Sequence, residues 1–322
     1  MSLYPFKFDP ILKERLWGGT KLNTVLGKPI TTDITGESWE LSAVPGDISE
    51  VSNGALANTS LQALIDEYNE ALLGKKVYER FGNEFPILIK FIDAKQDLSI
   101  QVHPNDALAK ERHNSFGKTE MWYIMQADEG SELIVGFNKN VTKEEYQKHL
   151  DDNTVTDLMN YEKVTEGDTF FINTGKIHAI GAGIMLAEIQ QTSDVTYRVY
   201  DFNRKDKEGN LRELHTEMAL DAIDYEKKDD FKVAYSKEPN ACGTMVDCPY
   251  FTTNYWNITE TTVIEVKERD SFTIFMCTKG EATISSPAGS IEIKRGETVL
   301  LPANSETITI EGAVELLEVY IS

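Results

Sequence analysis

The amino-acid sequence predicts a mainly β protein with two similar β units in tandem. Runs of β-branched and aromatic residues recur along the 322-residue chain between turn-forming residues. From Tyr250 onward such runs follow one another roughly every ten residues, the pattern of a small β-sandwich or barrel. In addition, residues 296–307 align without a gap on residues 167–178. This internal repeat indicates a second copy of the same β unit.

Composition limits the class of protein and its partners. The chain has 41% hydrophobic and 26% charged residues, which is normal for a soluble globular protein with one large domain or two ordinary ones. The N-terminus lacks a basic stretch followed by an apolar one, and no run is long enough to span a bilayer, so we expect a cytoplasmic protein. The net charge of −21 argues against nucleic-acid or anionic-membrane partners. A few basic residues in one pocket could still attract a small anion.

The cysteines predict neither a disulfide framework nor a zinc ribbon. The chain has three, Cys242, Cys248 and Cys277, and no two of them form a CxxC pair. We therefore expect them to be core residues or bystanders.

In chain order, residues 4–42 are typical of strands and loops. A helix is predicted over residues 60–68, where apolar residues recur at helical spacing behind a Ser60 N-cap, and a second over about 75–81. Residues 85–94 form a strongly β-prone run, which indicates a buried strand.

The next strand carries the first candidate ligands. Its alternation sends Ser99, Gln101 and His103 to one face and apolar residues to the other. Pro104 ends the strand, and a short helix is predicted over residues 106–113. Two potential metal ligands, Gln101 and His103, therefore share a face.

A further strand begins near residue 117, with Lys118 and Glu120 on one face as a polar pair in an otherwise apolar run. An ion pair on a solvated face and a functional pair are both compatible with this pattern. Two short amphipathic helices are predicted over residues 142–150 and 154–161.

The repeat itself carries the most informative histidine. Residues 169–172 form a short β-prone run, residues 173–175 force a turn, and His178 follows directly. A histidine held at the end of a β-structure is well placed to bind a metal, although a hydrogen-bonded histidine at a strand end is the ordinary alternative. The second copy has Thr307 at this position, so we expect one functional site and one structural copy.

The remaining elements of this half are a strand over residues 185–189, which carries Glu188, and a helix over residues 211–223.

Together these motifs resemble a known family. The pattern from Gly167 to His178 is similar to the second motif of cupins, which are jelly-roll barrels that hold a metal inside the barrel. Cupins supply the other ligands from His-x-His and a later Glu, and here Gln101-Val102-His103 and Glu120 fit, with glutamine replacing the first histidine. The series Ser-Ile-Gln-Val-His-Pro, Gly-Lys-Thr-Glu-Met-Trp-Tyr, His and then Arg198 resembles the type I mannose-6-phosphate isomerases.

The resemblance implies two jelly-roll (cupin) barrels in tandem. Residues 1–240 would form the catalytic cupin domain, with helical insertions, and residues 241–322 a degenerate cupin domain. Larger members of the family carry an additional helical domain for which this chain is too short, so it resembles the compact bacterial subtype.

The resemblance also implies a zinc cofactor, one ion per chain. The implied ligands are Gln101, His103, Glu120 and His178. Two imidazoles, a carboxylate and an amide oxygen suit zinc and leave room for water or a substrate oxygen.

The implied partner is a small sugar phosphate. By resemblance, the substrate pocket contains Ser99, Lys118, Glu188 and Arg198, and Arg204 lies near the phosphate. The implied reaction interconverts mannose 6-phosphate and fructose 6-phosphate through a cis-enediol, with Glu188 or Lys118 as the proton carrier. Arg198 would stabilise the negative charge that develops.

Two alternatives remain open at this point. One is another metal cupin enzyme, and the other is a non-catalytic cupin that binds or senses a sugar phosphate. Gln101 argues against an iron dioxygenase, because iron cupins usually have a histidine-rich site. The oligomeric state is not predicted.

Overall fold

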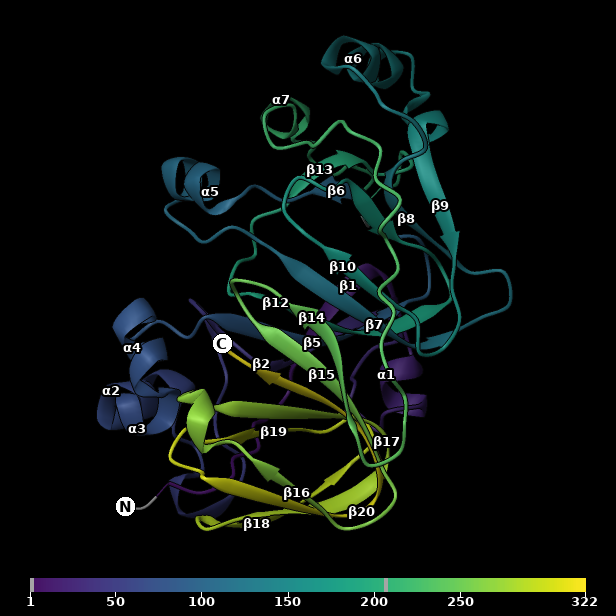
Figure 1. Ribbon diagram of the computed structural model, residues 1–322. Coiled ribbons are helices and arrows are strands. Elements are labelled where there is room, and N and C mark those ends of the chain that lie inside the picture. The colour runs from purple at the N-terminus through teal and green to yellow at the C-terminus, as the bar shows by residue number, and fades with distance from the viewer. Residues whose placement is uncertain (1–2, 206–207) are drawn as a thin grey trace.

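The computed structural model describes residues 3–205 and 208–322, and in this part the prediction of a mainly β protein is confirmed (Figure 1). The strands form sheets of six, five and seven strands and one small two-stranded hairpin, β3 (Ala43–Val44) with β4 (Asp47–Ile48). None of the helices in the described part of the chain is both long and apolar enough to span a membrane.

The first sheet has six antiparallel strands, and its central strands are buried along their whole length. In spatial order it comprises β1 (Ile11–Gly19), β2 (Thr35–Leu41), β5 (Ile87–Ala94), β12 (Ile184–Gln191), β7 (Glu120–Ala127) and β10 (Thr169–Ile172). All eight residues of β5 and all eight of β12 are buried, because both faces of these strands are covered by other parts of the protein.

The second sheet has five antiparallel strands and faces the first. In spatial order it comprises β13 (Tyr197–Tyr200), β6 (Ile100–Val102), β11 (His178–Ile180), β8 (Glu132–Phe137) and β9 (Met159–Lys163). One apolar cluster contains Ile92 and Trp122 of the first sheet together with Val135 and Ile180 of the second, so the inner faces of the two sheets pack together.

Three helices begin as the sequence predicts. Helices α2 (Leu61–Tyr68), α5 (Asp106–His113) and α6 (Lys143–Asp151) each follow a capping residue whose side chain accepts a backbone hydrogen bond, and these residues are Ser60, Asn105 and Thr142. The other helices are α1 (Lys21–Thr24), α3 (Glu70–Leu73), α4 (Lys75–Phe81) and α7 (Thr216–Ala219), and three single 3₁₀ turns lie at Gly54–Leu56, Val155–Leu158 and Lys267–Arg269. Helices α6 and α7 lie at the end of the molecule opposite to β18 and β20 (Figure 1).

Two predicted helices are wrong, because both segments form hydrogen bonds with neighbouring strands instead of helical ones. Residues 154–161 form a 3₁₀ turn followed by β9, since β9 pairs with β8 along the edge of the second sheet. Residues 211–223 contain only the short α7. Upstream of it, the backbone N–H of His215 donates to the carbonyl of Arg198 (2.7 Å), and the N–H of Arg198 donates to Nδ1 of His215 (3.1 Å). These bonds hold the segment against β13 instead of in a longer helix.

The C-terminal part forms one seven-stranded antiparallel sheet. Its main path comprises β14 (Cys242–Asp247), β15 (Thr252–Ile258), β20 (Thr307–Tyr320), β17 (Thr273–Ser286) and β18 (Gly289–Lys294), while β16 (Thr262–Glu265) pairs with β20 and β19 (Thr298–Leu301) pairs with β17. The three cysteines are free thiols, as the sequence predicts.

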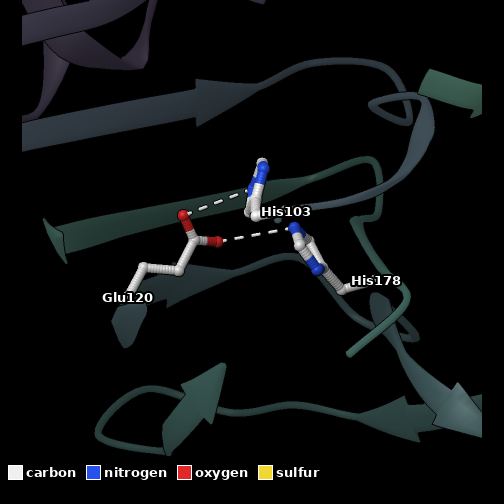
Figure 2. A group of neighbouring side chains, drawn as sticks. All are labelled: His103, Glu120 and His178. Atoms are coloured by element: carbon white, nitrogen blue, oxygen red, sulfur yellow. Dashed lines mark ion pairs between the residues drawn. The ribbon is translucent and has the colours of Figure 1, made fainter. Parts of the chain in front are cut away.

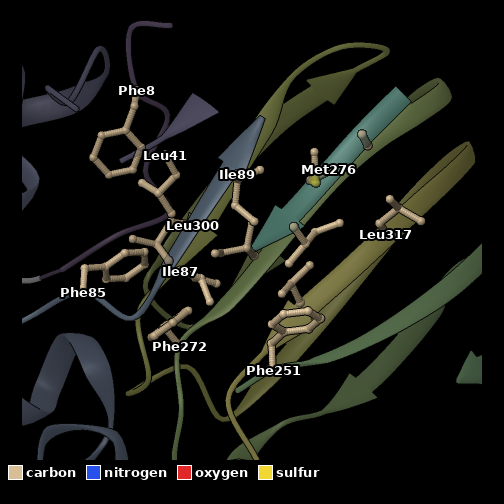
Figure 3. Packing of buried hydrophobic residues seen from close by; sticks show 14 of the residues in the cluster. Phe8, Leu41, Phe85, Ile87, Ile89, Phe251, Phe272, Met276, Leu300 and Leu317 are labelled. Carbon is tan, nitrogen blue, oxygen red and sulfur yellow. The ribbon is translucent and has the colours of Figure 1, made fainter. Parts of the chain in front are cut away.

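The largest apolar core lies between the C-terminal sheet and the first sheet (Figure 3). It joins Phe85, Ile87 and Ile89 of the first part to Phe272 and Leu317 of the C-terminal part. The C-terminal sheet therefore covers the outer face of β5, which explains why β5 is buried on both faces.

The two copies of the internal repeat adopt the same local structure. Gly167 and Gly296 have φ angles of +84° and +82°, a region that favours glycine, and they precede β10 and β19 at equivalent positions. His178 then begins β11, and Thr307 begins β20. Two jelly-roll barrels in tandem, and a domain boundary at residue 240, stay predictions.

Candidate active site

Three side chains that the sequence singles out converge between the two sheets (Figure 2). His103 follows β6, Glu120 is the first residue of β7, and His178 is the first residue of β11. All three are buried, one ligand atom from each lies within 4.8 Å of the others, and the two imidazole rings have their centroids 4.8 Å apart. The sequence predicted that these residues would meet, and the structure brings them together.

Hydrogen bonds to backbone carbonyls orient both imidazoles. Nδ1 of His103 lies 3.0 Å from the carbonyl of Val195, and Nδ1 of His178 lies 2.8 Å from that of Lys176. A carbonyl can only accept, so Nδ1 carries the proton in each ring and Nε2 presents a lone pair. The two Nε2 atoms lie 3.6 and 3.5 Å from the carboxylate oxygens of Glu120.

This arrangement fits a divalent cation. Both Nε2 atoms and both oxygens of Glu120 are buried and have no hydrogen-bond partner within the described residues. Four lone-pair donors that face one another repel unless a cation lies between them, and buried polar atoms without partners are rare. A metal ion bound between these four atoms would give each of them a partner.

The pKa shifts agree with this interpretation. Burial lowers the pKa of His178 to about 4, and burial together with the charge of Lys118 lowers the pKa of His103 well below its usual value. Both rings are therefore neutral near pH 7, the form in which imidazole binds metals. Burial and the charge of Glu188 raise the pKa of Glu120 to about 8, against the opposing effect of Lys118. A positive ion at the site would favour the ionised carboxylate.

Gln101 lies on the face of the second sheet that carries His178. It pairs directly with His178 of β11 on one side and with Arg198 of β13 on the other. Directly paired residues project from the same face of a sheet, so the three side chains form one row across neighbouring strands. Gln101 as a fourth ligand stays a prediction.

A cavity of about 320 Å³ adjoins the three candidate ligands through Gln101, which pairs with His178, and Lys118, whose Nζ lies 3.5 Å from Glu120. Its lining includes Ser99, Gln101, Lys118, Glu188 and Arg198, all of which the sequence assigned to the site. Among its other lining residues are Arg15, Trp17, Glu37, Trp39, Lys90, Asp194 and Arg212. Five basic and three acidic side chains line it, so the cavity carries excess positive charge in a protein whose net charge is −21.

Glu188 is held in place by two donors from neighbouring strands. Nζ of Lys90 lies 3.0 Å from one carboxylate oxygen, and Nε1 of Trp122 donates to the other (2.9 Å). Burial alone would raise the pKa of Glu188, but the charges of Lys90 and Lys118 outweigh burial and lower it. Glu188 is therefore an oriented carboxylate that stays ionised in the wall of the cavity.

A second carboxylate extends this charged wall. Glu37 accepts hydrogen bonds from Arg15 (2.9 Å) and from Nε1 of Trp39 (2.8 Å). Burial would raise its pKa, but Lys90 and Arg15 lower the pKa of Glu37 to about 2. Charges thus alternate along the wall from Glu188 through Lys90 and Glu37 to Arg15.

Lys118 lies at the junction of the candidate metal ligands and the cavity. Its Nζ is 3.5 Å from Glu120, and its side chain is almost fully buried while it lines the cavity. The sequence left open whether Lys118 and Glu120 form a pair on a solvated face, and the structure shows that both are interior.

Arg204 does not line this cavity. Its guanidinium contacts the carboxylate of Asp201 and the carbonyl of Asp97 and stacks near the ring of Phe202. Arg212 also contacts Asp201, with Nε 2.7 Å from the carboxylate, but Arg212 does line the cavity. The role of Arg204 in phosphate binding stays a prediction.

Sequence analysis missed Arg15, Glu37, Lys90 and Arg212. For Lys90 a signal was present, because a lysine in the middle of the apolar run over residues 85–94 needs a buried partner. Arg15 and Glu37 lie on strands whose pairing was not predictable, and Arg212 lies outside any strand or helix.

Comparison with known proteins identifies the family. A family model for the catalytic domain of type I phosphomannose isomerases matches residues 5–135, and one for the cupin domain of mannose-6-phosphate isomerases matches residues 242–321. Mannose-6-phosphate isomerase ManA of Bacillus subtilis is 36% identical over 320 residues, which cover 98% of this chain and 99% of the relative.

Two further matches extend over both chains. The mannose-6-phosphate isomerase of Streptococcus mutans is 34% identical over 97% of each chain. The crystal structure of mannose 6-phosphate isomerase from Bacillus subtilis superposes with a TM-score of 0.90 at 33% identity, covering 99% of this chain and all of that one. Because these relatives are more than 30% identical to it over nearly their whole length, the chain belongs to the type I mannose-6-phosphate isomerase (phosphomannose isomerase) family of cupin proteins.

Proposed function

We propose that this protein is a zinc-dependent aldose–ketose isomerase that interconverts mannose 6-phosphate and fructose 6-phosphate through a cis-enediol. The observation that carries this proposal is the buried group of His103, Glu120 and His178, with its unpartnered lone pairs, beside a positively charged cavity. Full-length relatives named as mannose-6-phosphate isomerases support the substrate.

His103, Glu120 and His178 would hold the zinc ion, with Gln101 as the fourth ligand. Nitrogen and carboxylate oxygen donors are those that zinc prefers. When bound, the ion supplies Lewis-acid polarisation of a sugar oxygen. The hydrogen bonds to Val195 and Lys176 keep each imidazole in the tautomer that can bind it.

Glu188 and Lys118 are the candidates for proton transfer between C1 and C2. Glu188 is ionised and oriented by Lys90 and Trp122, as a general base requires. Lys118 is buried, lines the same cavity and is the other candidate. A Glu188→Gln variant that still exchanges the C2 hydrogen of mannose 6-phosphate with solvent would assign the transfer to Lys118.

Arg198 stabilises the enediolate in this proposal. It lies in the row that contains Gln101 and His178, and its buried Nε has no hydrogen-bond partner within the described residues. A planar guanidinium can contact two adjacent oxygens, and an ammonium cannot do so in the same way. Unchanged turnover in an Arg198→Lys variant would contradict this role.

In this proposal the phosphate binds to arginines of the cavity lining. Arg198 and Arg212 both line the cavity, as does Ser99. The family resemblance points to Arg204 for the phosphate, whereas the lining of the cavity favours Arg212. The two arginines can be tested separately.

A coupled assay of mannose 6-phosphate isomerisation, with and without a chelator, tests the proposed function. We expect turnover that is lost with chelator and restored by added zinc. A metal-bound protein that binds the sugar phosphate without turnover would be the non-catalytic alternative. Turnover of a different substrate by the metal-loaded protein would indicate another metal cupin enzyme.

A further inference from the structure

The short segment that carries Lys118 is held on both sides by two polar side chains. On one side, the N–H of Gly117 donates to Oδ1 of Asp106 (2.8 Å). On the other side, the N–H of Thr119 donates to Oε1 of Gln191 (2.8 Å), and the carbonyl of Thr119 accepts from the N–H of Gln191 (3.0 Å). Lys118 therefore lies between two peptide groups that cannot shift without breaking hydrogen bonds.

The two holding side chains also bond to each other. Nε2 of Gln191 donates to the same Oδ1 of Asp106 (3.0 Å), which fixes the orientation of the Gln191 amide. The other carboxylate oxygen of Asp106, Oδ2, accepts a hydrogen bond from the hydroxyl of Tyr250 (2.9 Å). Tyr250 lies between β14 and β15 of the C-terminal sheet, so this bond links the C-terminal part to the active-site segment.

The backbone at Gly117 packs closely against the backbone of Asn105 and Asp106. A Cβ at residue 117 would lie 2.7 Å from the backbone nitrogen of Asp106 and 2.8 Å from the carbonyl carbon of Asn105, so only glycine allows this approach. Asn105 caps α5, and the chain just before it carries Pro104 and the ligand His103. A shift of Asp106 would therefore disturb the backbone next to two of the three ligands.

We propose that Asp106, Gln191 and Tyr250 form a clamp through which the C-terminal sheet positions Lys118 and Glu120 for the reaction. Tyr250 holds the carboxylate of Asp106, Asp106 and Gln191 hold the peptides on either side of Lys118, and Glu120 follows directly in β7. These three are positioning residues, since they act through the groups that they hold. The inference rests on the proposed function and assigns to the C-terminal sheet the role of holding the segment that carries Lys118 and Glu120.

Hydrogen exchange and kinetics of matched variants test the clamp. In Tyr250→Phe, we expect the amides of Gly117 and Thr119 to exchange at least about tenfold faster, and kcat to fall about 5- to 10-fold with KM changed less than about threefold. Tyr235→Phe is the control, because the Tyr235 hydroxyl donates to the carbonyl of Gly167 (2.7 Å), which is not a residue of the clamp, and we expect both quantities to stay near wild type.

A pair of substitutions at Asp106 separates positioning from stability. Asp106→Ala removes the three hydrogen bonds that the Asp106 carboxylate accepts from Gly117, Gln191 and Tyr250, and we expect kcat to fall about 100-fold. Asp106→Asn retains an oxygen for Gly117 and Gln191 and a donor for Tyr250, so kcat should recover to within about threefold of wild type.

The following results would contradict the clamp or the function on which it rests. If Tyr250→Phe and Asp106→Ala lower only the melting temperature and leave kcat unchanged, or if exchange at Gly117 is as slow in Tyr250→Phe as in wild type, the clamp does not position the segment. If wild type itself does not isomerise the sugar, the proposed function fails, while the exchange rates still decide whether the clamp exists. Should Asp106→Ala not fold, Tyr250→Phe carries the test alone.

Discussion

Replacing Arg212 by glutamine separates the two assignments of the phosphate contact. Arg212 lines the cavity, and Asp201 holds its guanidinium through Nε at 2.7 Å, so the planar group is already oriented. Arg204 contacts the same carboxylate, but its guanidinium also donates to the backbone carbonyls of Asp97 and Asp201, neither of which lines the cavity. Arg212→Gln and Arg204→Gln are matched variants, because each removes one positive charge that forms an ion pair with Asp201.

The expected size follows from the type of contact. A hydrogen bond to a charged group contributes about 1.5–3 kcal/mol net, which corresponds to roughly a 10- to 150-fold change in affinity. We therefore expect Arg212→Gln to raise KM for mannose 6-phosphate by about 10- to 150-fold, with a smaller effect on kcat, because the phosphate lies far from C1 and C2. Arg204→Gln should change KM less than about threefold.

Steady-state kinetics in the coupled assay measure both values, and inhibition by inorganic phosphate gives a second readout. The inhibition constant should rise in Arg212→Gln in parallel with KM. A tenfold rise of KM in Arg204→Gln, with Arg212→Gln near wild type, would refute the reasoning from the cavity lining and support the assignment by family resemblance.

Three further predictions concern the metal, the charged wall and pH. His178→Ala should abolish zinc binding in metal analysis and lower kcat by more than about 1000-fold, whereas chelated wild type should recover on adding zinc. Lys90→Met and Lys28→Met each remove one partner of a buried ion pair and should each lower the free energy of unfolding by about 3–5 kcal/mol. Only Lys90→Met should also lower kcat, since Lys28 does not line the cavity; equal activity in the two variants would show that Lys90 is merely structural. Because the pKa of Glu37 is lowered to about 2, its ionised form stabilises the fold above the unfolded-state pKa of 4.5, and this stability is lost as pH falls toward 2. The difference in unfolding free energy between wild type and Glu37→Gln should therefore shrink by about 2 kcal/mol between pH 6 and pH 3 in denaturant titrations, and a constant difference would contradict it.

Local sequence signals determined much of the fold and of the candidate metal site. Ser60 and Asn105 cap helices that begin where the residue pattern predicts, because capping depends on residues within one turn. The period of two along residues 99–103 predicted that Gln101 and His103 share a face; Gln101 lines the cavity and His103 belongs to the buried His–Glu–His group. The repeat motif located His178 at the start of a strand. Each of these signals is contained in a few consecutive residues.

Tertiary structure decided what distant strands bring together. Whether Lys118 and Glu120 face solvent or the interior depends on the second sheet, which packs on the face of the first sheet that carries Trp122 and Ile124. The pairing of Glu188 with Lys90 depends on the register of β12 on β5, and the contact of Tyr250 with Asp106 joins residues 144 positions apart. A chain's local propensities cannot specify such a register, because it is set by the burial of whole strand faces at once. The sequence therefore singled out His103, Glu120 and His178 as candidate metal ligands, whereas only the tertiary structure decided which charges surround them.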